Sequence, residues 1–329
     1  IRNVLVIMAD DHARYVAGAY GNDIVRTPNL DRLAGAGVRF DRAFCNSPVC
    51  TASRQSIITG KLPHASGVTL LNTPLAEEQI TIADHMSEHG FRTAAIGKMH
   101  FNSNLQHGFQ LRLDGKEHDE HLKSHPARKP PPDVPVKPRW RPFRDPARVW
   151  LNADGLPGTG YPQPGDWENQ GLYEKDFLGT WLTERAADFI RENKDQRFLM
   201  WLSYYEPHSP YNFPVEYAGR HDPSRMPVPS ASREDERWIP EIFRPLTRED
   251  RQGIVRSYYQ SVEYLDANIG RILESLKEQG LENDTLVLYF ADHGYLLGHH
   301  GRFEKHSMWD EAIRVPLVVY HPRFQARTA

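Results

Sequence analysis

The sequence is poor in cysteine, in long apolar runs and in excess charge of either sign. Cys45 and Cys50 are the only cysteines in 329 residues, and they form neither a disulfide framework nor a cysteine-rich metal motif. No apolar run approaches the roughly 20 residues that a membrane span needs. The formal net charge of −3 lacks the basic excess of a nucleic-acid-binding surface. These absences leave a globular protein of one large domain or two smaller ones.

Segments typical of buried strands alternate with amphipathic segments along the chain. Continuous apolar runs at 3–9, 198–204 and 285–291 predict strands that are buried on both faces. The other regular segments that we expect are helices at 28–37, 82–89, 176–193 and 248–279, and strands at 38–44, 91–96 and 315–320. This order predicts an α/β fold with a mostly parallel central sheet sandwiched by helices.

Two proline-rich stretches interrupt the alternation, at about 102–171 and 211–245. Long segments without regular structure are usually insertions that shape a site, or linkers. The first stretch contains the aromatic residues Trp140, Trp150, Tyr161 and Trp167, which favour an ordered insertion. We therefore expect a single domain over residues 1–329 that carries both insertions. Since the chain stops just after a predicted strand, we also expect further sequence after Ala329.

The stretch from Cys50 to Gly60, C-T-A-S-R-Q-S-I-I-T-G, predicts a helix with a thiol at its start. Thr51 or Ser53 is the expected N-cap. Unpaired backbone N–H groups and the positive dipole end make a helix start suitable for an anion. Cys50 is therefore a candidate nucleophile, and Arg54, one turn on, faces the same side. Alone, such a pair is far more often a small buried cysteine and a solvated surface arginine, so the functional interpretation depends on partners elsewhere in the chain.

Acidic residues follow two of the predicted strands. Asp10 and Asp11 come directly after 3–9, and Asp292 and His293 come directly after 285–291. Ligands of open α/β sheets bind outside the carboxyl ends of the strands, so these side chains should converge. Buried carboxylates repel one another unless a cation lies between them. Oxygen ligands favour Ca²⁺ or Mg²⁺, whereas an imidazole nitrogen favours Mn²⁺ or another transition metal.

Basic residues also follow predicted strands. Lys98 and His100 follow the predicted strand at 91–96, and His208 follows the one at 198–204. Lysine is a compact charge that suits a sulfate or phosphate oxygen, and histidine can transfer a proton near neutral pH. We therefore regard these residues and Lys305 as candidates for anion binding and proton transfer, although each alone is more often an ordinary surface residue.

The ordered motifs resemble those of the type I, formylglycine-dependent sulfatases of the alkaline phosphatase-like superfamily. C-T-A-S-R at 50–54 is similar to the family's maturation motif, which usually reads Cys-x-Pro-x-Arg. Further matches follow in the same order along nearly the whole chain: T-P-N-L-D-R-L-A at 27–34, T-G at 59–60, G-K-M-H at 97–100, E-P-H-S-P at 206–210, A-D-H-G at 291–294 and V-P at 315–316.

The resemblance implies a chemistry for residue 50. A formylglycine-generating maturation enzyme would convert Cys50 to formylglycine, whose hydrate attacks the sulfur of a sulfate ester and releases sulfate and an alcohol, either a sugar or an aryl alcohol. It also implies one divalent ion, with calcium expected first and magnesium or manganese as alternatives. The metal ligands would be Asp10, Asp11, Asp292, His293 and the matured residue 50.

The resemblance also assigns roles to the basic residues. Arg54 would orient the diol and support the metal site, and His100 would help to deprotonate the second hydroxyl. Lys98, His208 and Lys305 would bind the sulfate oxygens. The family's chains are longer, so a C-terminal subdomain on a four-stranded sheet would be missing or only begun here.

Two positions depart from the usual family pattern. Ala52 stands where proline is common in the maturation motif, and His293 stands where many members carry asparagine. Histidine there resembles choline-sulfatase-like and phosphonate monoester hydrolase-like members, so a phosphonate monoester or phosphodiester hydrolase is the alternative function. A catalytically silent binder of sulfated ligands is the third. The sequence supports no prediction of cellular location or oligomeric state.

Overall fold

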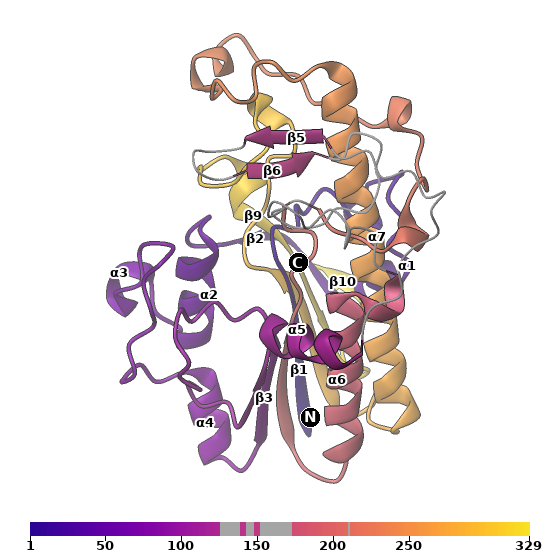
Figure 1. The fold of residues 1–329 in the computed structure, drawn as a ribbon. Coiled ribbons are helices and arrows are strands. Elements are labelled where there is room, and N and C mark those ends of the chain that lie inside the picture. The colour runs from indigo at the N-terminus through magenta and orange to yellow at the C-terminus, as the bar shows by residue number, and fades with distance from the viewer. Residues whose placement is uncertain (126–138, 143–147, 152–172, 210) are drawn as a thin grey trace.

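The computed structural model describes residues 1–125, 139–142, 148–151, 173–209 and 211–329, and an eight-stranded sheet forms its centre (Figure 1). The strand order is β10-β2-β9-β8-β1-β7-β3-β4. The strands of this sheet are β1 (Asn3–Ala9), β2 (Val38–Phe44), β3 (Arg92–Gly97), β4 (Leu111–Leu113), β7 (Phe198–Ser203), β8 (Thr285–Ala291), β9 (Arg314–Tyr320) and β10 (Arg327–Thr328). A separate antiparallel pair joins β5 (Arg139–Pro142) to β6 (Arg148–Leu151).

Five neighbouring strands of the sheet, β8, β1, β7, β3 and β4, run parallel to one another. Strand β1 lies between β8 and β7 and is parallel to both, with Leu5 opposite Val287 on one side and Met200 on the other. Strand β3 continues the parallel arrangement beyond β7, and β4 follows it. Strand β9 runs antiparallel to β8 and to β2. The predicted α/β class with a mostly parallel sheet is therefore confirmed.

Helices cover both faces of the sheet. Successive residues of β1 point to opposite faces and therefore belong to two different apolar clusters. Leu5 and Ile7 pack with α1 (Pro28–Ala36), α6 (Leu178–Glu192) and α7 (Arg248–Glu278). Val6 and Met8 face the other side, which α2 (Cys50–Thr59) and α4 (Ile82–Glu88) cover. Figure 1 shows these two layers on opposite sides of the strands. The remaining helices are α3 (Pro63–Ser66), α5 (Gly115–Ser124) and α8 (Asp310–Ile313).

The second proline-rich stretch, 211–245, packs against the first half of α7. The structure describes all of this segment, and its regular structure consists of three short 3₁₀ turns, which fits the predicted irregular stretch. Met226 and Phe243 contribute to an apolar cluster with Ile254 and Tyr258 of α7. Burial of these side chains gives the segment a defined path beside the helix.

The first proline-rich stretch contains regular structure that the sequence analysis did not predict. Strand β4 and helix α5 lie within 102–125, so the expectation of irregular structure is wrong there. A capping box starts α5, since the Asp114 side chain accepts from Lys116 N and the Glu117 side chain accepts from Asp114 N. Most of the remainder, up to residue 171, lies outside the described residues.

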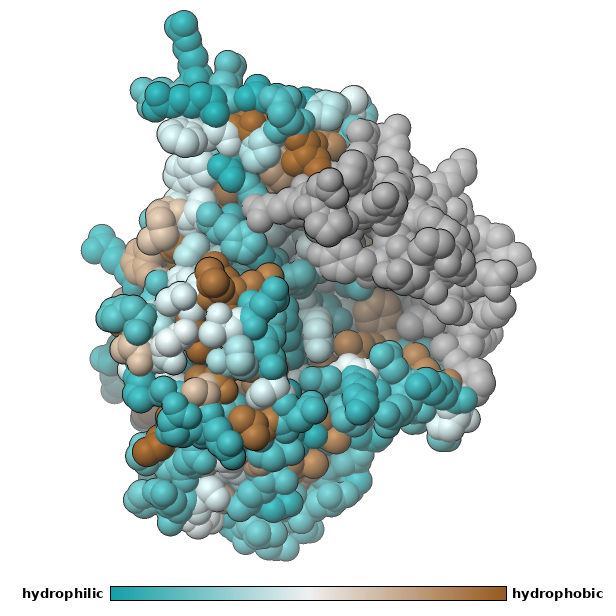
Figure 2. Space-filling model, turned by 60° about the vertical axis from the view of Figure 1, so that its left-hand side comes forward, coloured by the Kyte–Doolittle hydropathy of each residue, from teal (hydrophilic) through white to brown (hydrophobic). Residues whose placement is uncertain are grey.

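The face that carries α2, α3 and α4 is mainly hydrophilic, with separate hydrophobic patches (Figure 2). Large apolar side chains that are exposed include Leu62, Leu70 and Ile80. Among the helices of the described residues, none has the length and apolar character needed to cross a membrane.

Candidate active site

Four neighbouring parallel strands bring polar side chains to the same edge of the sheet. Asp292 follows β8, Asp10 follows β1, Ser203 ends β7 and Lys98 follows β3. The strands β8, β1, β7 and β3 are adjacent in that order, so these residues lie side by side at the carboxyl edge. This is the place where open α/β sheets bind ligands.

Helix α2 places Cys50 above this edge, but its start is not capped as the sequence analysis predicts. Val49 is the N-cap residue, in an extended conformation and without a side-chain cap. Thr51 Oγ1 donates to the carbonyl oxygen of Leu71 at 2.6 Å, and Ser53 Oγ donates to the carbonyl oxygen of Asp292 at 2.5 Å. The prediction that Thr51 or Ser53 caps the helix is wrong because both hydroxyls bind neighbouring segments instead.

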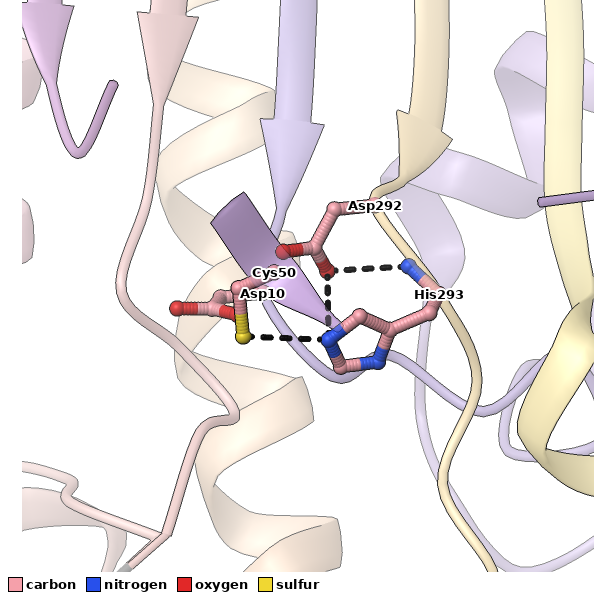
Figure 3. Close-up of side chains that lie close together, drawn as sticks. All are labelled: Asp10, Cys50, Asp292 and His293. Atoms are coloured by element: carbon pink, nitrogen blue, oxygen red, sulfur yellow. Dashed lines mark hydrogen bonds and ion pairs between the residues drawn. The ribbon is translucent and has the colours of Figure 1, made fainter. Parts of the chain in front are cut away.

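The sulfur of Cys50 contacts the imidazole of His293, with 3.1 Å between Sγ and Nε2 (Figure 3). Nδ1 of the same ring donates to the carbonyl oxygen of Gly294 at 2.9 Å, which fixes the ring with Nε2 towards the sulfur. Burial raises the pKa of the Cys50 thiol, but the charges of Lys305, His293 and Lys98 outweigh it and hold the pKa well below its usual value. Burial lowers the pKa of His293, but Asp292 and the Cys50 thiolate raise it to about 10. The pair therefore favours a thiolate beside an imidazolium.

The guanidinium of Arg54 ties α2 to the ends of three strands. Its Nε donates to Asp292 Oδ2 at 2.8 Å, and its Nη1 donates to Ser203 Oγ at 2.7 Å and to the carbonyl oxygen of Lys98. Burial opposes its charge, but Asp292 and Asp10 raise its pKa above the usual value. Arg54 is therefore a fixed cation inside the site and not a surface charge.

The acidic residues form a candidate metal site. Asp10, Cys50, Asp292 and His293 each offer one ligand atom, and these atoms lie within 4.8 Å of one another (Figure 3). A second group with the same spacing adds Asp11 and His208 to Asp10 and Cys50.

Two observations fit a divalent cation at this site. Asp10 Oδ1 is buried without a hydrogen-bond partner and has a 3.7 Å ion pair with Arg54 Nη2, so it keeps lone pairs for a metal ion. Carboxylate oxygens with an imidazole nitrogen form a suitable ligand set, and a bound cation would replace the proton on the histidine nitrogen.

Lysines flank this site and bind its carboxylates. Lys98 Nζ pairs with Asp10 Oδ2, and Lys305 Nζ donates to both oxygens of Asp11 at 2.7 and 2.8 Å. Burial raises the pKa of Asp10, but the charge of Lys98 and its other basic neighbours holds the value well below normal. Burial has the larger effect on Asp292 and raises its pKa to about 6, although Arg54 opposes the shift.

The two predicted proton-transfer histidines line the same space. His100 lies beside the Cys50 sulfur, where it helps to lower the pKa of the thiol, and its buried Nδ1 has no hydrogen-bond partner. His208 Nε2 lies 4.0 Å from Asp11 Oδ2, while its Nδ1 donates to the carbonyl oxygen of Ser209 at 2.7 Å. The structure thus brings together every residue that the sequence analysis selected: Asp10, Asp11, Cys50, Arg54, Lys98, His100, His208, Asp292, His293 and Lys305.

Three residues that support the site were missed by the sequence analysis. Ser203 accepts from Arg54, and its position at the end of an apolar strand was a usable signal. Gln55 Nε2 donates to the carbonyl oxygen of His100 at 2.9 Å, and the Tyr258 hydroxyl donates to that of Asp11. Both lie inside helices, where spacing alone does not distinguish them from their neighbours.

Comparison with known proteins finds sulfatases that match nearly the whole chain. The Sulfatase family matches residues 2–328. Human iduronate 2-sulfatase is 28% identical over 354 residues, which cover 97% of this chain and 60% of that protein. The arylsulfatase of Clostridium perfringens is 30% identical over 335 residues, which cover 97% of this chain and 68% of that protein. The chain thus spans about 60% of the length of the first of these relatives.

Solved structures show the same fold. The phosphonate monoester hydrolase SpPMH from Silicibacter pomeroyi superposes with a TM-score of 0.79 at 24% identity, over 100% of this chain and 70% of that one. The structure of BT4656 in complex with its substrate D-glucosamine-2-N,6-O-disulfate gives a TM-score of 0.72 at 22% identity, over 100% of this chain and 73% of that one. Both neighbours support the alkaline phosphatase-like arrangement that the sequence motifs imply.

Proposed function

This chain belongs to the sulfatase family, and on that premise we propose that it hydrolyses a sulfate ester to inorganic sulfate and an alcohol. The observation that carries the proposal is the position of Cys50. Its sulfur lies 3.1 Å from His293 Nε2, within a set of carboxylates that two lysines and an arginine neutralise. The alcohol is a sugar or an aryl group.

Residue 50 and a cation are the two reactive components of the proposal. Matured to formylglycine by a separate enzyme, residue 50 would supply one hydroxyl to attack sulfur and a second whose loss of a proton releases sulfate. Asp10, Asp11, Asp292 and His293, with the matured residue 50, would hold the cation, for which calcium is expected first and magnesium or manganese are alternatives. A bound divalent ion would act there as a Lewis acid.

The remaining side chains bind and orient the ester. Lys98, His208 and Lys305 lie next to the carboxylates of the candidate metal site, where they can contact the sulfate oxygens. His100 contacts residue 50 and has a free buried nitrogen, so it is placed to accept the proton of the second hydroxyl. Arg54 keeps Asp292 ionised and oriented.

Hydrolysis of phosphonate monoesters or phosphodiesters is the second candidate function. Two observations favour it: the nitrogen ligand of His293, and the similarity of fold to the phosphonate monoester hydrolase of Silicibacter pomeroyi. Sulfate and phosphonate monoesters share a tetrahedral centre with anionic oxygens, so the same lysines suit both.

One preparation tests both functions. The protein is produced with a formylglycine-generating enzyme, and mass spectrometry of the peptide that contains residue 50 measures the maturation. Turnover of an aryl sulfate and of the matching aryl phosphonate monoester is then compared, with Cys50→Ala as the control. A matured residue 50 and faster turnover of the sulfate support the proposal. A preference for the phosphonate reverses the order, and an unmodified thiol in active protein refutes the role of formylglycine. Turnover that Cys50→Ala abolishes excludes a silent binder.

A further inference from the structure

A cavity of about 510 Å³ opens beside Lys98 and His100 and extends the candidate active site away from the carboxylates. Its far wall comes from the loop after His100 and from the start of α5. The polar residues beyond Lys98 and His100 are Asn102, Ser103, Asn104, Arg112, Asp114 and Tyr205. Because the cavity shares Lys98 and His100 with the reaction site, a group attached to a bound sulfate can enter it.

Tyr205 lies between the reaction site and the start of α5. The centroid of its ring is 5.7 Å from Lys98 Nζ, and a Cβ built at Gly115 would lie 3.7 Å from the tyrosine hydroxyl. Within the described part of the chain, this hydroxyl forms no hydrogen bond. The cavity therefore offers a phenol group that can donate to a ligand and accept from it.

Asp114 gives the far wall a negative charge. Its carboxylate accepts from the backbone at the start of α5, with 3.1 Å between Lys116 N and Oδ1. No basic side chain among the described residues pairs with it. A carboxylate with spare lone pairs forms strong hydrogen bonds with hydroxyl groups and repels a second anion.

The arginine of the cavity is already engaged. Arg112 Nη1 donates to the carbonyl oxygens of Ser103 and Leu105 at 2.8 and 2.9 Å, and its guanidinium carbon lies 5.1 Å from the ring centroid of Phe101. Lys98 is paired with Asp10. The cavity beyond Lys98 therefore presents hydroxyl and amide groups, the carboxylate of Asp114 and the guanidinium of Arg112, whose Nη1 is held by the loop carbonyls.

We propose that this cavity binds the alcohol part of the ester, and that it selects a neutral polyhydroxylated group, such as an uncharged sugar ring, over one with a second sulfate or a carboxylate. The proposal rests on the proposed sulfatase function. Asp114 is the specificity-determining residue, because it accepts from ring hydroxyls and repels a further anion. Tyr205 contributes a second hydrogen bond and an aromatic face.

The test compares kcat/KM for three substrates: 4-nitrophenyl sulfate, a monosulfated neutral hexose, and a disulfated or uronic acid counterpart of that hexose. We expect the neutral hexose to exceed its anionic counterpart. In Asp114→Asn the amide keeps the helix cap but not the charge, so the preference for the neutral hexose should shrink about 10-fold, as loss of a charged hydrogen bond and of a repulsion implies. Asp119→Asn, on the exposed side of the same helix, is the matched control and should keep the wild-type preference.

Tyr205→Phe supplies a second variant at the same wall. It should lower kcat/KM for the neutral hexose relative to 4-nitrophenyl sulfate by about 5-fold, which corresponds to one neutral hydrogen bond. Inhibition of the wild-type enzyme supplies a readout without any variant: the unsulfated neutral hexose should compete with 4-nitrophenyl sulfate better than the matching uronic acid.

The outcomes separate this proposal from the one on which it rests. Inactivity towards all three esters, with residue 50 matured, overturns the sulfatase function and the subsite together. Turnover of the esters with equal or greater preference for the anionic sugar overturns the subsite alone. An Asp114→Asn variant that unfolds is recognised by its thermal midpoint, and the inhibition experiment on the wild-type enzyme then decides.

Discussion

Arg54 and Asp292 form a buried ion pair with 2.8 Å between Nε and Oδ2, although they lie 238 positions apart in the chain. Their side chains are 3% and 0% exposed. Breaking such a pair by removal of one partner is costly because the other charge stays buried. The contact therefore fixes α2 against the end of β8, and with it the position of Cys50 relative to His293.

Replacement of Arg54 by lysine tests this connection. A single ammonium group keeps the charge but cannot make the bonds to Asp292, Ser203 and the Lys98 carbonyl together. We expect the free energy of unfolding to fall by about 1–3 kcal/mol, the cost of unpaired buried groups. Urea denaturation measures it. Arg42→Lys, at an exposed position, should change it by less than about 0.5 kcal/mol. Equal stability of the two variants would contradict the structural role of Arg54.

Ser203→Ala probes one bond of the same group. The serine is fully buried and accepts from Arg54 Nη1 at 2.7 Å. Its loss should destabilise the protein by about 1–2 kcal/mol, since a buried charged donor loses a partner. Ser87→Ala removes a hydrogen bond at an exposed place, where Ser87 accepts from Gln110, and serves as the control. An equal fall in the free energy of unfolding for both variants would show that the buried bond contributes no more than the exposed one.

Glu206 gives stability a defined pH dependence. Burial raises the pKa of this carboxyl from its usual 4.5 to about 7, and its Oε2 has no hydrogen-bond partner. Between pH 4.5 and pH 7 this carboxyl is ionised in the unfolded chain but still protonated in the folded protein. The free energy of unfolding therefore falls as the pH rises from about 4.5 through 7. At about 1.4 kcal/mol per pH unit, the group contributes a decline of about 3 kcal/mol.

Glu206→Gln should remove that decline. The difference in unfolding free energy between variant and wild type should move in favour of the variant by about 3 kcal/mol between pH 4.5 and 7.5. Denaturant titrations at several pH values measure it, with Glu78→Gln on the exposed surface as the control. Parallel pH profiles for wild type and Glu206→Gln would show that the glutamate ionises normally.

Removal of divalent cations should lower stability as well as activity. Asp10, Asp11 and Asp292 meet in one buried place, so a cation that binds there stabilises the folded state. At a calcium concentration 100 times the dissociation constant, the gain is about 2.7 kcal/mol. Thermal unfolding after chelation, and again after addition of calcium, magnesium or manganese, measures it. Asp10→Asn should show a smaller shift on addition of calcium, and an unchanged midpoint in the wild type would refute the site.

The sequence predicted the architecture and which residues meet at the edge of the sheet, because both depend on local patterns. Apolar runs located the strands, and the rule that ligands bind at the carboxyl ends brought Asp10, Lys98 and Asp292 to one edge. The position of Arg54 one turn after Cys50 followed from helix geometry. The roles of these residues in catalysis stay predictions.

The features that sequence missed arise from tertiary contacts. Thr51 and Ser53 have suitable side chains for a cap, but other segments accept their hydroxyl protons. The start of α5 at Asp114 has a regular capping box, which the sequence analysis missed because it treated this segment as part of the proline-rich stretch. Tyr258 and Gln55 support the site through backbone carbonyls, and no periodicity marks such a contact in advance.

The central place of β1 in the sheet affects how the chain can be divided. Residues before 125 supply Asp10, Cys50 and Lys98, whereas residues after 173 supply His208, Asp292 and the strands on both sides of β1. A cut between these parts would leave six of the ten selected site residues on one piece and four on the other, and would open the sheet. Reassembly of two separately produced halves would therefore have to rebuild the core before any ester could be turned over.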